Sequence, residues 1–261
     1  MTTFTSHRPG HPNWVDVSSP DIDASVDFYA ALFGWTFTEA GDPEETGGYR
    51  MFSKGDHLVA GIGPVQDGGP PPAWSTYIAS ADADATAGAI TAAGGTLLME
   101  PMDVMTAGRM LFAMDPAGAA FGVWQAGEHH GAQLANEPGS FSWNELNTRD
   151  PAGASSFYGS VFGWGANTNE MPDGSTYTEW LDDGAPIGGM IDMRGRVPDE
   201  VPPHWMTYFA VDGTDAAVER VASAGGGVMV PATDIPPGRF AVVADPFGAH
   251  FAVITLTDPP A

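Results

Sequence analysis

The chain reads through one pattern of residues twice, in the same order, and this duplication constrains its fold more than any other feature. The first copy lies between Asn13 and Ala126, and the second lies between Phe141 and Thr255. Matched positions keep a spacing of 129 residues over the first part of the copy and 131 residues further along, because small insertions fall in turn-rich stretches. Each copy is long enough to hold its own hydrophobic core. We therefore predict two similar domains in tandem.

The matched residues run along the whole copy and include aromatic pairs, glycines and an Asp-Pro-x-Gly turn. They are Trp14 with Trp143, Asp21 with Asp150, Phe28-Tyr29 with Phe157-Tyr158, Gly34-Trp35 with Gly163-Trp164, Trp74–Tyr77 with Trp205–Tyr208, Gly108-Arg109 with Gly238-Arg239, and Asp115-Pro116 with Asp245-Pro246. A repeat of a few tens of residues would indicate a solenoid or a propeller. A repeat of this size indicates a whole domain.

Each copy divides into two halves that share the order strand, helix, three strands. In the first half, residues 14–18 alternate as a strand, Asp21 is placed to cap a helix that begins at Ile22, and Gly34 ends that helix. Strands are predicted next at 35–39, 49–53 and 58–62. The second half repeats the order, with a strand at 74–79, a helix at 84–93, and strands at 96–99, 110–114 and 121–125. The predicted fold class is α+β, built from four βαβββ units.

The ends of the two copies set the predicted domain boundaries. We assign residues 1–12 to an N-terminal tail, 13–126 to the first domain, 127–139 to a linker, 140–257 to the second domain, and 258–261 to a C-terminal tail. The linker has no hydrophobic periodicity, so we expect its His129 and His130, like His7 and His11 in the tail, to be solvated loop residues.

The composition excludes several classes of function. The chain has 33 acidic and 9 basic residues, a net charge of −24, and such a field repels nucleic-acid phosphates and anionic membranes. No apolar run approaches the roughly 20 residues of a membrane helix, and the N-terminus lacks the apolar region of a signal peptide. The absence of cysteine removes disulfides and thiolate chemistry. We expect a cytoplasmic protein whose partner is a small molecule.

The chain resembles the vicinal oxygen chelate superfamily, which includes glyoxalase I, the extradiol dioxygenases and the bleomycin-binding proteins. The resemblance rests on Asp-x-x-x-Ser-x-x-Phe-Tyr at residues 21–29, on Phe-Gly-Trp at residues 33–35 and on the Asp-Pro-x-Gly turns. The Trp-x-x-Tyr segments are most similar to tandem-domain members labelled glyoxalase-like or hydroxylase. The resemblance implies mixed sheets that curl into a cup around a small-molecule ligand. It also implies two domains that pack as an internal pseudo-dimer, in a monomer or a homodimer.

The resemblance further implies where a divalent metal would bind in each cup. Catalytic members hold it with His and Glu from the first strand of each unit and from the last strand of the second unit. The corresponding residues here are Trp14, Ser75 and Gly122 in the first domain and Trp143, Met206 and Ala252 in the second. None of these six is a usual ligand for Fe, Mn, Ni or Zn. We therefore predict no metal and no other cofactor.

An alternative metal site appears if the register shifts by two residues, which keeps the same face of each strand. In the second domain this shift reaches Glu145, His204 and His250, and two histidines with a carboxylate can bind one divalent metal. The same residues, together with Tyr208, could instead be catalytic as proton donors and acceptors without a metal. In the first copy both histidine positions are alanines, so this chemistry is expected in the second domain only.

Five further residues are candidates for ligand contact. Trp14, Trp143 and Tyr77 would line aromatic cups suited to a ring-containing ligand, and Trp74, Trp205 and Trp124 would add to this aromatic surface. Arg109 and Arg239 would clamp a carboxylate or an enolate. The alternatives are core packing for the aromatic residues and surface ion pairs for the two arginines.

Two functions are consistent with these observations. The first is a metal-free binding protein that holds an aromatic or apolar metabolite in an aromatic cup. The alternative is a lyase, isomerase or oxygenase that acts on an oxygenated small molecule in the second domain, through Glu145, His204, Tyr208 and His250.

Overall fold

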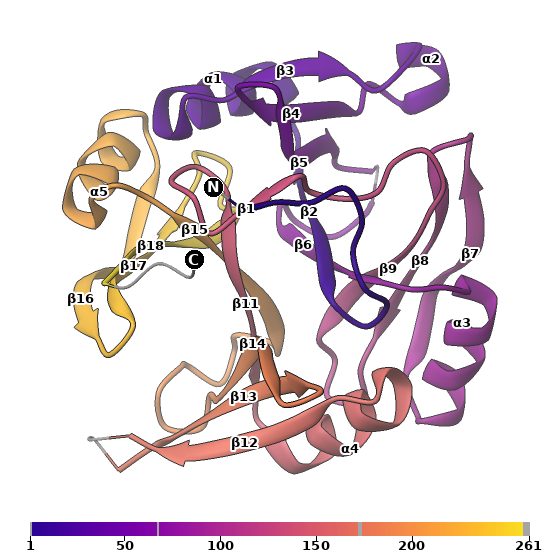
Figure 1. Ribbon diagram of the computed structural model, residues 1–261. Helices are drawn as coiled ribbons and strands as arrows, with labels where there is room; N and C mark the ends of the chain where they lie inside the picture. Colours follow the sequence, from indigo (N-terminus) through magenta and orange to yellow (C-terminus); the bar gives the residue numbers. More distant parts are fainter. Residues whose placement is uncertain (1, 67, 172–173, 258–261) are drawn as a thin grey trace.

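A computed structural model describes residues 2–66, 68–171 and 174–257 of the protein, and both copies of the repeat are α+β domains (Figure 1). The first domain contains β2 (Pro12–Ser19), α1 (Ile22–Phe33), β3 (Thr36–Glu39), α2 (Pro43–Thr46), β4 (Arg50–Lys54), β5 (His57–Pro64), β6 (Trp74–Ala79), α3 (Ala83–Ala92), β7 (Thr96–Val104), β8 (Gly108–Met114) and β9 (Ala120–Ala126). The predicted fold class and its βαβββ units are confirmed. The four-residue helix α2, in the loop after β3, was not predicted.

The second domain has the same order of elements without a counterpart of α2. It contains β11 (Phe141–Thr148), α4 (Pro151–Phe162), β12 (Gly165–Glu170), β13 (Thr176–Asp182), β14 (Ala185–Asp192), β15 (His204–Ala210), α5 (Thr214–Ser223), β16 (Gly227–Ile235), β17 (Gly238–Ala244) and β18 (His250–Leu256). Two short strands, β1 (Thr2–Thr3) and β10 (Leu134–Ala135), pair with each other outside the domains.

The first helix of each domain begins and ends at the residues that the sequence predicts. Asp21 Oδ1 accepts a hydrogen bond from the Ala24 amide at 3.0 Å, and Gly34 ends α1 with a left-handed φ of 70°. Asp150 and Gly163 have the same roles at the two ends of α4. An aspartate cap satisfies a free amide of the first turn, and glycine adopts positive φ without strain. Local signals of this kind do not depend on tertiary contacts.

Each domain forms one eight-stranded mixed sheet. The orders are β3-β4-β5-β2-β6-β9-β8-β7 and β12-β13-β14-β11-β15-β18-β17-β16. The two units of a domain join where β2 pairs with β6, and β11 with β15, in antiparallel fashion. In β2 the buried Val15 and Val17 face the helices, whereas Trp14 and Asp16 face the other way. We call the helix-bearing side of each sheet its outer face and the opposite side its inner face.

The two domains pack together through their outer faces. Helix α1 contacts α5, and α3 contacts α4, so that each domain's helices lie against the other domain (Figure 1). Tyr29 Oη donates a hydrogen bond to Asp245 at 3.0 Å, and Tyr158 Oη donates one to Asp115 at 3.2 Å. The Phe-Tyr and Asp-Pro-x-Gly matches in the sequence therefore mark the contact between the domains.

Two further pairs of contacts repeat this symmetry. The Trp35 indole donates to the carbonyl of Gly139, and the Trp164 indole donates to that of Gly10, each at 2.7 Å. At the centre, the hydroxyl of Thr76 on β6 donates to the side chain of Asn144 on β11 at 2.9 Å. Because the outer faces are joined, the inner faces point to opposite sides of the molecule, one between β3 and β7 and the other between β12 and β16 (Figure 1).

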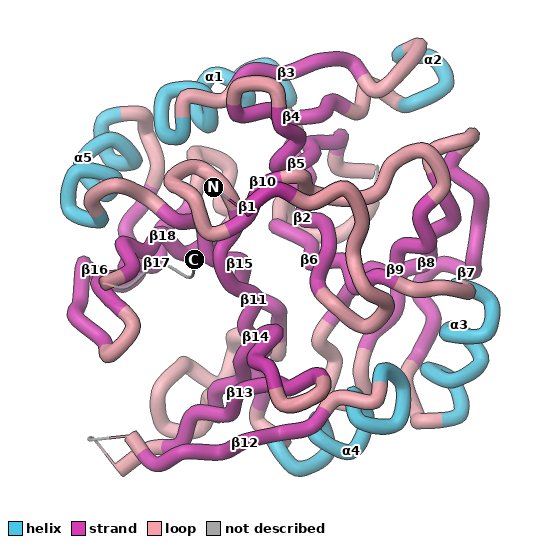
Figure 2. The backbone as a smooth tube through the Cα atoms, in the orientation of Figure 1, coloured by secondary structure: helices cyan, strands magenta, loops and turns pink. Residues whose placement is uncertain are grey.

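The N-terminal segment and the linker pack together on the first domain. Strand β10 lies beside β5, with β1 paired to it (Figure 2). His7 contacts the carbonyl of Ala132 at 2.7 Å, and His11 contacts Asp182 of the second domain at 2.8 Å. The expectation that these two histidines are solvated is wrong. Residues 258–261, assigned to a C-terminal tail, lie outside the described residues. Within the described ranges, no helix is long and apolar enough to cross a membrane.

Candidate functional site on the inner faces

Each inner face holds a carboxylic acid surrounded by two tyrosine hydroxyls and an indole. We call these groups the first and the second aromatic–acid cluster. The first cluster consists of Trp14, Asp16, Tyr49 and Tyr77, and the second consists of Trp143, Glu145, Tyr177 and Tyr208. The strand pairing explains both groups, because Trp14 lies opposite Tyr77 and Trp143 lies opposite Tyr208 across the junction of the two units.

In the first cluster, both tyrosines bind the same carboxylate oxygen. Tyr49 Oη donates to Asp16 Oδ2 at 3.0 Å, and Tyr77 Oη donates to it at 2.8 Å. The indole of Trp14 donates to Tyr49 Oη at 3.1 Å, so that Tyr49 both accepts and donates. The acid is thereby held in one orientation.

The second cluster repeats this arrangement with a longer acid. Tyr208 Oη donates to Glu145 Oε1 at 3.0 Å, and Tyr177 also hydrogen-bonds to Glu145. The indole of Trp143 donates to Tyr177 Oη at 2.8 Å. The structure therefore brings together Glu145 and Tyr208, two of the four residues predicted to be catalytic.

Glycines on the neighbouring strands make room for the outer tyrosines of the two clusters. A Cβ atom at Gly61 of β5 would lie 1.9 Å from Tyr49 Oη, and one at Gly189 of β14 would lie 1.9 Å from Tyr177 Oη. The sequence reasoning missed all four residues. The signal was present, however, because both the tyrosines and the glycines keep a common spacing of 128 residues between the copies.

Burial moves the protonation of both acids toward neutral pH. It raises the pKa of Glu145 to about 7, although the tyrosine hydrogen bonds, Asn147 and the positive charge of Arg196 act in the opposite direction. Burial also raises the pKa of Asp16 to about 6 against the hydrogen bonds from its tyrosines. Arg196 lies in the loop after β14 and was not singled out in the sequence. A carboxyl group with such a pKa can give or take a proton near pH 7.

The two clusters differ in how they are covered. Trp14 is only 4% exposed, and its ring lies against that of His129, whereas Trp143 is partly exposed. The second cluster also adjoins an apolar surface to which β15, β17 and β18 contribute. That surface consists of Met206, Tyr208, Ala252 and Ile254, with Phe240 and Val242 packed against them. Ligand access therefore favours the second inner face.

The structure does not gather the alternative metal ligands. Glu145 lies opposite Met206, and His204 lies one pair further along, opposite Asn147. His250 begins β18, on the far side of β15 from Glu145, and neighbouring strands lie about 4.8 Å apart. In the parts of the chain that the structure describes, no group of three or more His, Cys, Asp or Glu side chains could hold a metal ion. The three residues share a face but do not converge on one ligand position.

The two histidines instead lie near each other at the end of the second inner face. His204 Nδ1 contacts the carbonyl of Pro202 at 2.9 Å, and burial together with the charge of His250 lowers the pKa of His204. His250 itself is exposed. Neither histidine forms a hydrogen bond with Glu145 among those described, so the predicted catalytic group is divided into two pairs.

The positions that bind metal in catalytic relatives also lack ligands here. The pairing places Trp14, Tyr77 and Gly122 in one row across the first sheet, and Trp143, Tyr208 and Ala252 in one row across the second. The β6 neighbour of Trp14 is thus Tyr77, not Ser75, which corrects the predicted alignment of that strand. Indole, phenol, glycine and alanine at these positions do not fit a divalent metal.

Two predicted ligand contacts lie on the wrong side of the sheets. Arg109 pairs with Asp84 of α3 and Asp103, and Arg239 pairs with Asp215 of α5 and Asp234, in ion pairs on the surface. Strand alternation causes this, because Met110 and Phe112 point to the inner face and Arg109 therefore points to the outer one. The prediction that these arginines clamp a ligand in the cups is wrong.

Two of the predicted cup tryptophans also belong to the contact between the domains. Trp74 Nε1 donates to Tyr29 Oη at 3.1 Å, and Trp205 Nε1 donates to Tyr158 Oη at 3.0 Å, all in buried surroundings. These indoles pack on the outer faces as part of the core. The aromatic surface of the inner faces comes from Trp14, Trp124 and Trp143.

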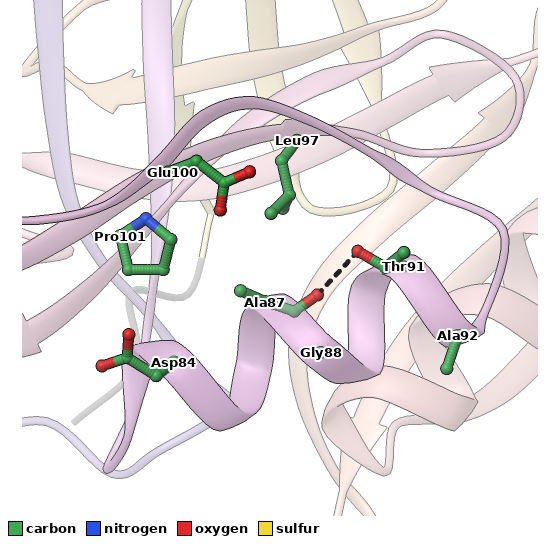
Figure 3. A pocket seen from close by; sticks show the side chains of 8 residues that line it. All are labelled: Asp84, Ala87, Gly88, Thr91, Ala92, Leu97, Glu100 and Pro101. Atoms are coloured by element: carbon green, nitrogen blue, oxygen red, sulfur yellow. Dashed lines mark hydrogen bonds between the residues drawn. The ribbon is translucent and has the colours of Figure 1, made fainter.

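Surface hollows lie elsewhere on the molecule and contain no chemistry of this kind. One of about 620 Å³ lies between α3 and β7 on the outside of the first domain (Figure 3). Its acids are Asp84, which already binds Arg109, and Glu100. Another of about 400 Å³ surrounds the Arg239 ion pairs. Neither hollow is lined by a residue of the aromatic–acid clusters.

Comparison with known proteins agrees with this architecture. The sequence model of the Glyoxalase/Bleomycin resistance protein/Dioxygenase superfamily matches residues 11–123 and 140–253. The chain therefore belongs to this superfamily, with one match in each domain. It is similar to a protein of Mycobacterium tuberculosis described as "Putative glyoxylase CFP32", with 43% identity over 97% of this chain and 98% of that protein. It is also similar to "Anthracycline biosynthesis protein DnrV" of Streptomyces peucetius, with 40% identity over 98% of this chain and 96% of that protein.

Solved structures share the fold at low sequence identity. The Mn(II)-bound glyoxalase from Novosphingobium aromaticivorans aligns with a TM-score of 0.65 and 16% identity, over 97% of this chain and 84% of that one. The 2,3-dioxygenase LapB from Pseudomonas sp. KL28 aligns with a TM-score of 0.62 and 14% identity, over 100% of this chain and 95% of that one. At such identity the likeness concerns the fold alone.

Proposed function

We propose that the protein binds a planar, oxygen-bearing aromatic small molecule on the inner face of the second domain, without a metal. The observation that carries this proposal is the difference between the clusters, since Trp143 is partly exposed whereas its counterpart Trp14 is covered. The second cluster places an indole and two phenols beside apolar side chains, which suits stacking on a flat ring. The relative named for anthracycline biosynthesis supports this ligand class, because anthracyclines are flat, oxygen-rich ring systems.

The polar groups of the site would recognise oxygen atoms on the ligand. Glu145 is 6% exposed and, when protonated, can donate a hydrogen bond to a carbonyl or quinone oxygen. The positive charge of Arg196 acts on Glu145, and it would favour a ligand with phenolate or enolate character. A ring system that carries both a carbonyl and an acidic hydroxyl group meets these requirements.

Binding can be tested with a dihydroxyanthraquinone, followed by quenching of tryptophan fluorescence. The variant Tyr208→Phe removes a hydroxyl group from the second cluster, and Tyr77→Phe removes the matching hydroxyl group from the first. We expect Tyr208→Phe to weaken binding about tenfold, the effect of about 1.4 kcal/mol, whereas Tyr77→Phe leaves it unchanged. Equal effects of both substitutions, or binding that requires added metal, would refute the proposal.

A second candidate function is proton transfer on the bound molecule. The observation that favours it is Glu145 itself, a buried carboxyl whose pKa is raised to about 7 and whose position is fixed by Tyr208. Such a group can remove a proton from an acidic carbon and return it, as in a lyase or an isomerase.

Anthrone is a suitable probe for this activity, because a base removes a proton from its methylene carbon and the site refills with deuterium in heavy water. The protein should accelerate this exchange, and the rate should rise as Glu145 ionises near pH 7. The Glu145→Gln variant should lose the acceleration, and the matched Asp16→Asn variant should keep it. Anthrone that binds but does not exchange faster than in buffer would leave binding as the function and exclude proton transfer from this probe.

A further inference from the structure

The linker residue His129 lies on the inner face of the first domain, and this corrects the expectation that it is a solvated loop residue. Its imidazole ring meets the ring of Trp14 edge-on, with centroids 4.4 Å apart, and that of Trp124 at 5.5 Å. The Trp124 indole donates to the carbonyl of His129 at 2.8 Å, and the His129 amide donates to the carbonyl of Ala107 at 3.0 Å. Backbone and ring are therefore both held against the inner face.

The chemistry of this ring is that of a bound neutral aromatic molecule. His129 Nε2 is buried and has no hydrogen-bond partner among the described residues. Burial, with smaller contributions from the charges of His130 and His7, lowers the pKa of His129 to about 4, so the ring is uncharged at neutral pH. The ring thus occupies its place through aromatic contact, and no ion pair or side-chain hydrogen bond fixes it there.

The second domain has the matching inner face without this occupant. The residue that corresponds to Trp124 is Ile254, which cannot make the indole contact to a linker carbonyl. The described part of the second domain ends at Thr257, soon after β18. The two copies therefore share the aromatic–acid cluster, and they differ in what lies over it.

We propose that His129 is a built-in occupant of the first inner face, which closes that face so that the chain binds one ligand, in the second domain. The part that concerns ligand number rests on the proposed function. The part that concerns His129 stands independently of it: removing the side chain opens a site on Trp14 and Trp124 that accepts a small neutral heteroaromatic ring.

The test replaces the missing side chain with a free molecule of the same chemistry. The variant His129→Gly is titrated with 4-methylimidazole at pH 8, where the probe is largely neutral, and the indole N–H signals of Trp14 and Trp124 are followed by proton–nitrogen NMR. The matched control is His130→Gly, at the exposed neighbouring residue. We expect saturable binding by His129→Gly in the millimolar range, and no binding by the control or by the unaltered protein.

The variant His129→Leu separates closure from folding, because its apolar side chain should fill the same place and keep the face closed. Binding of the probe by the unaltered protein, or its absence in a folded His129→Gly variant, would overturn the proposal. If His129→Gly does not fold, His129→Ala is titrated under the same criteria. The dihydroxyanthraquinone then reports the number of sites, expected to rise from one to two per chain in the glycine variant. Failure of that dye to bind any variant counts against the proposed function, while the 4-methylimidazole result still decides the role of His129.

Discussion

The Glu145→Gln substitution should make the protein more stable relative to the unaltered protein as pH rises, although it removes a buried polar group. The pKa of Glu145 is raised by burial from its ordinary 4.5 to about 7. The folded state therefore binds more protons than the unfolded state between these values, and stability falls as pH rises through this window. The difference of about 2.5 pH units, at 1.36 kcal/mol per unit, corresponds to about 3 kcal/mol. Glutamine does not ionise and escapes this loss.

The assay is urea unfolding of both proteins at a series of pH values from 4 to 9, with the difference in unfolding free energy as the quantity of interest. Taking the difference removes the pH dependence of the other acidic residues. At pH 4 the variant should be equal or slightly less stable, because an amide replaces a protonated carboxyl in the same hydrogen bonds. By pH 8 the difference should have moved by about 3 kcal/mol in favour of the variant.

Asp16→Asn is the matched control for this series. Burial also raises the pKa of Asp16, from 3.8 to about 6, so its difference should change in the same direction but be largely complete by pH 7. A stability difference between Glu145→Gln and the unaltered protein that does not vary with pH would refute the reasoning. A difference that grows toward acid pH would reverse its sign and refute it equally.

Three further substitutions test the packing around the site and between the domains. Gly189→Ala places a Cβ atom 1.9 Å from Tyr177 Oη, so we expect the phenol to leave the second cluster, with a loss of dihydroxyanthraquinone affinity and a cost of about 1–3 kcal/mol in urea unfolding; normal affinity would contradict this geometry. Tyr158→Phe removes the buried hydrogen bond to Asp115 and should cost about 1–3 kcal/mol in the same assay, whereas a neutral result would show that this link between the domains does not stabilise the fold. Asp21→Ala removes the cap of α1 and should lower stability by about 1 kcal/mol, with ligand affinity unchanged.

The parts of the fold that could be predicted depend on local or repeated signals. Helix α1 was placed correctly because its aspartate cap and its glycine end are written within one short segment. The pairing of Glu145 with Tyr208 could be anticipated because the two copies differ at few positions on the central strands. Tyr49 and Tyr177 were missed because each follows a variable loop, and their common spacing differs from that of the preceding matches.

The remaining errors arise where three-dimensional context decides. Arg109 was assigned to the cup as one of few cations, yet strand alternation directs it toward Asp84 of α3, where it forms an ion pair. His129 lies outside the repeat, so no comparison between the copies could show that it folds back onto Trp14. The alternative metal set failed because a shared face does not bring side chains on separate strands together.

The central claim is that ligand binds to the second inner face and that the first is closed. It is tested most directly by following the indole N–H signals of Trp143 and Trp14 by proton–nitrogen NMR while a dihydroxyanthraquinone is added to the unaltered protein. We expect the Trp143 signal to shift to saturation at one equivalent of ligand while the Trp14 signal stays in place, because His129 covers it. A shift of Trp14 with Trp143 unchanged, or saturation at two equivalents, would contradict the claim.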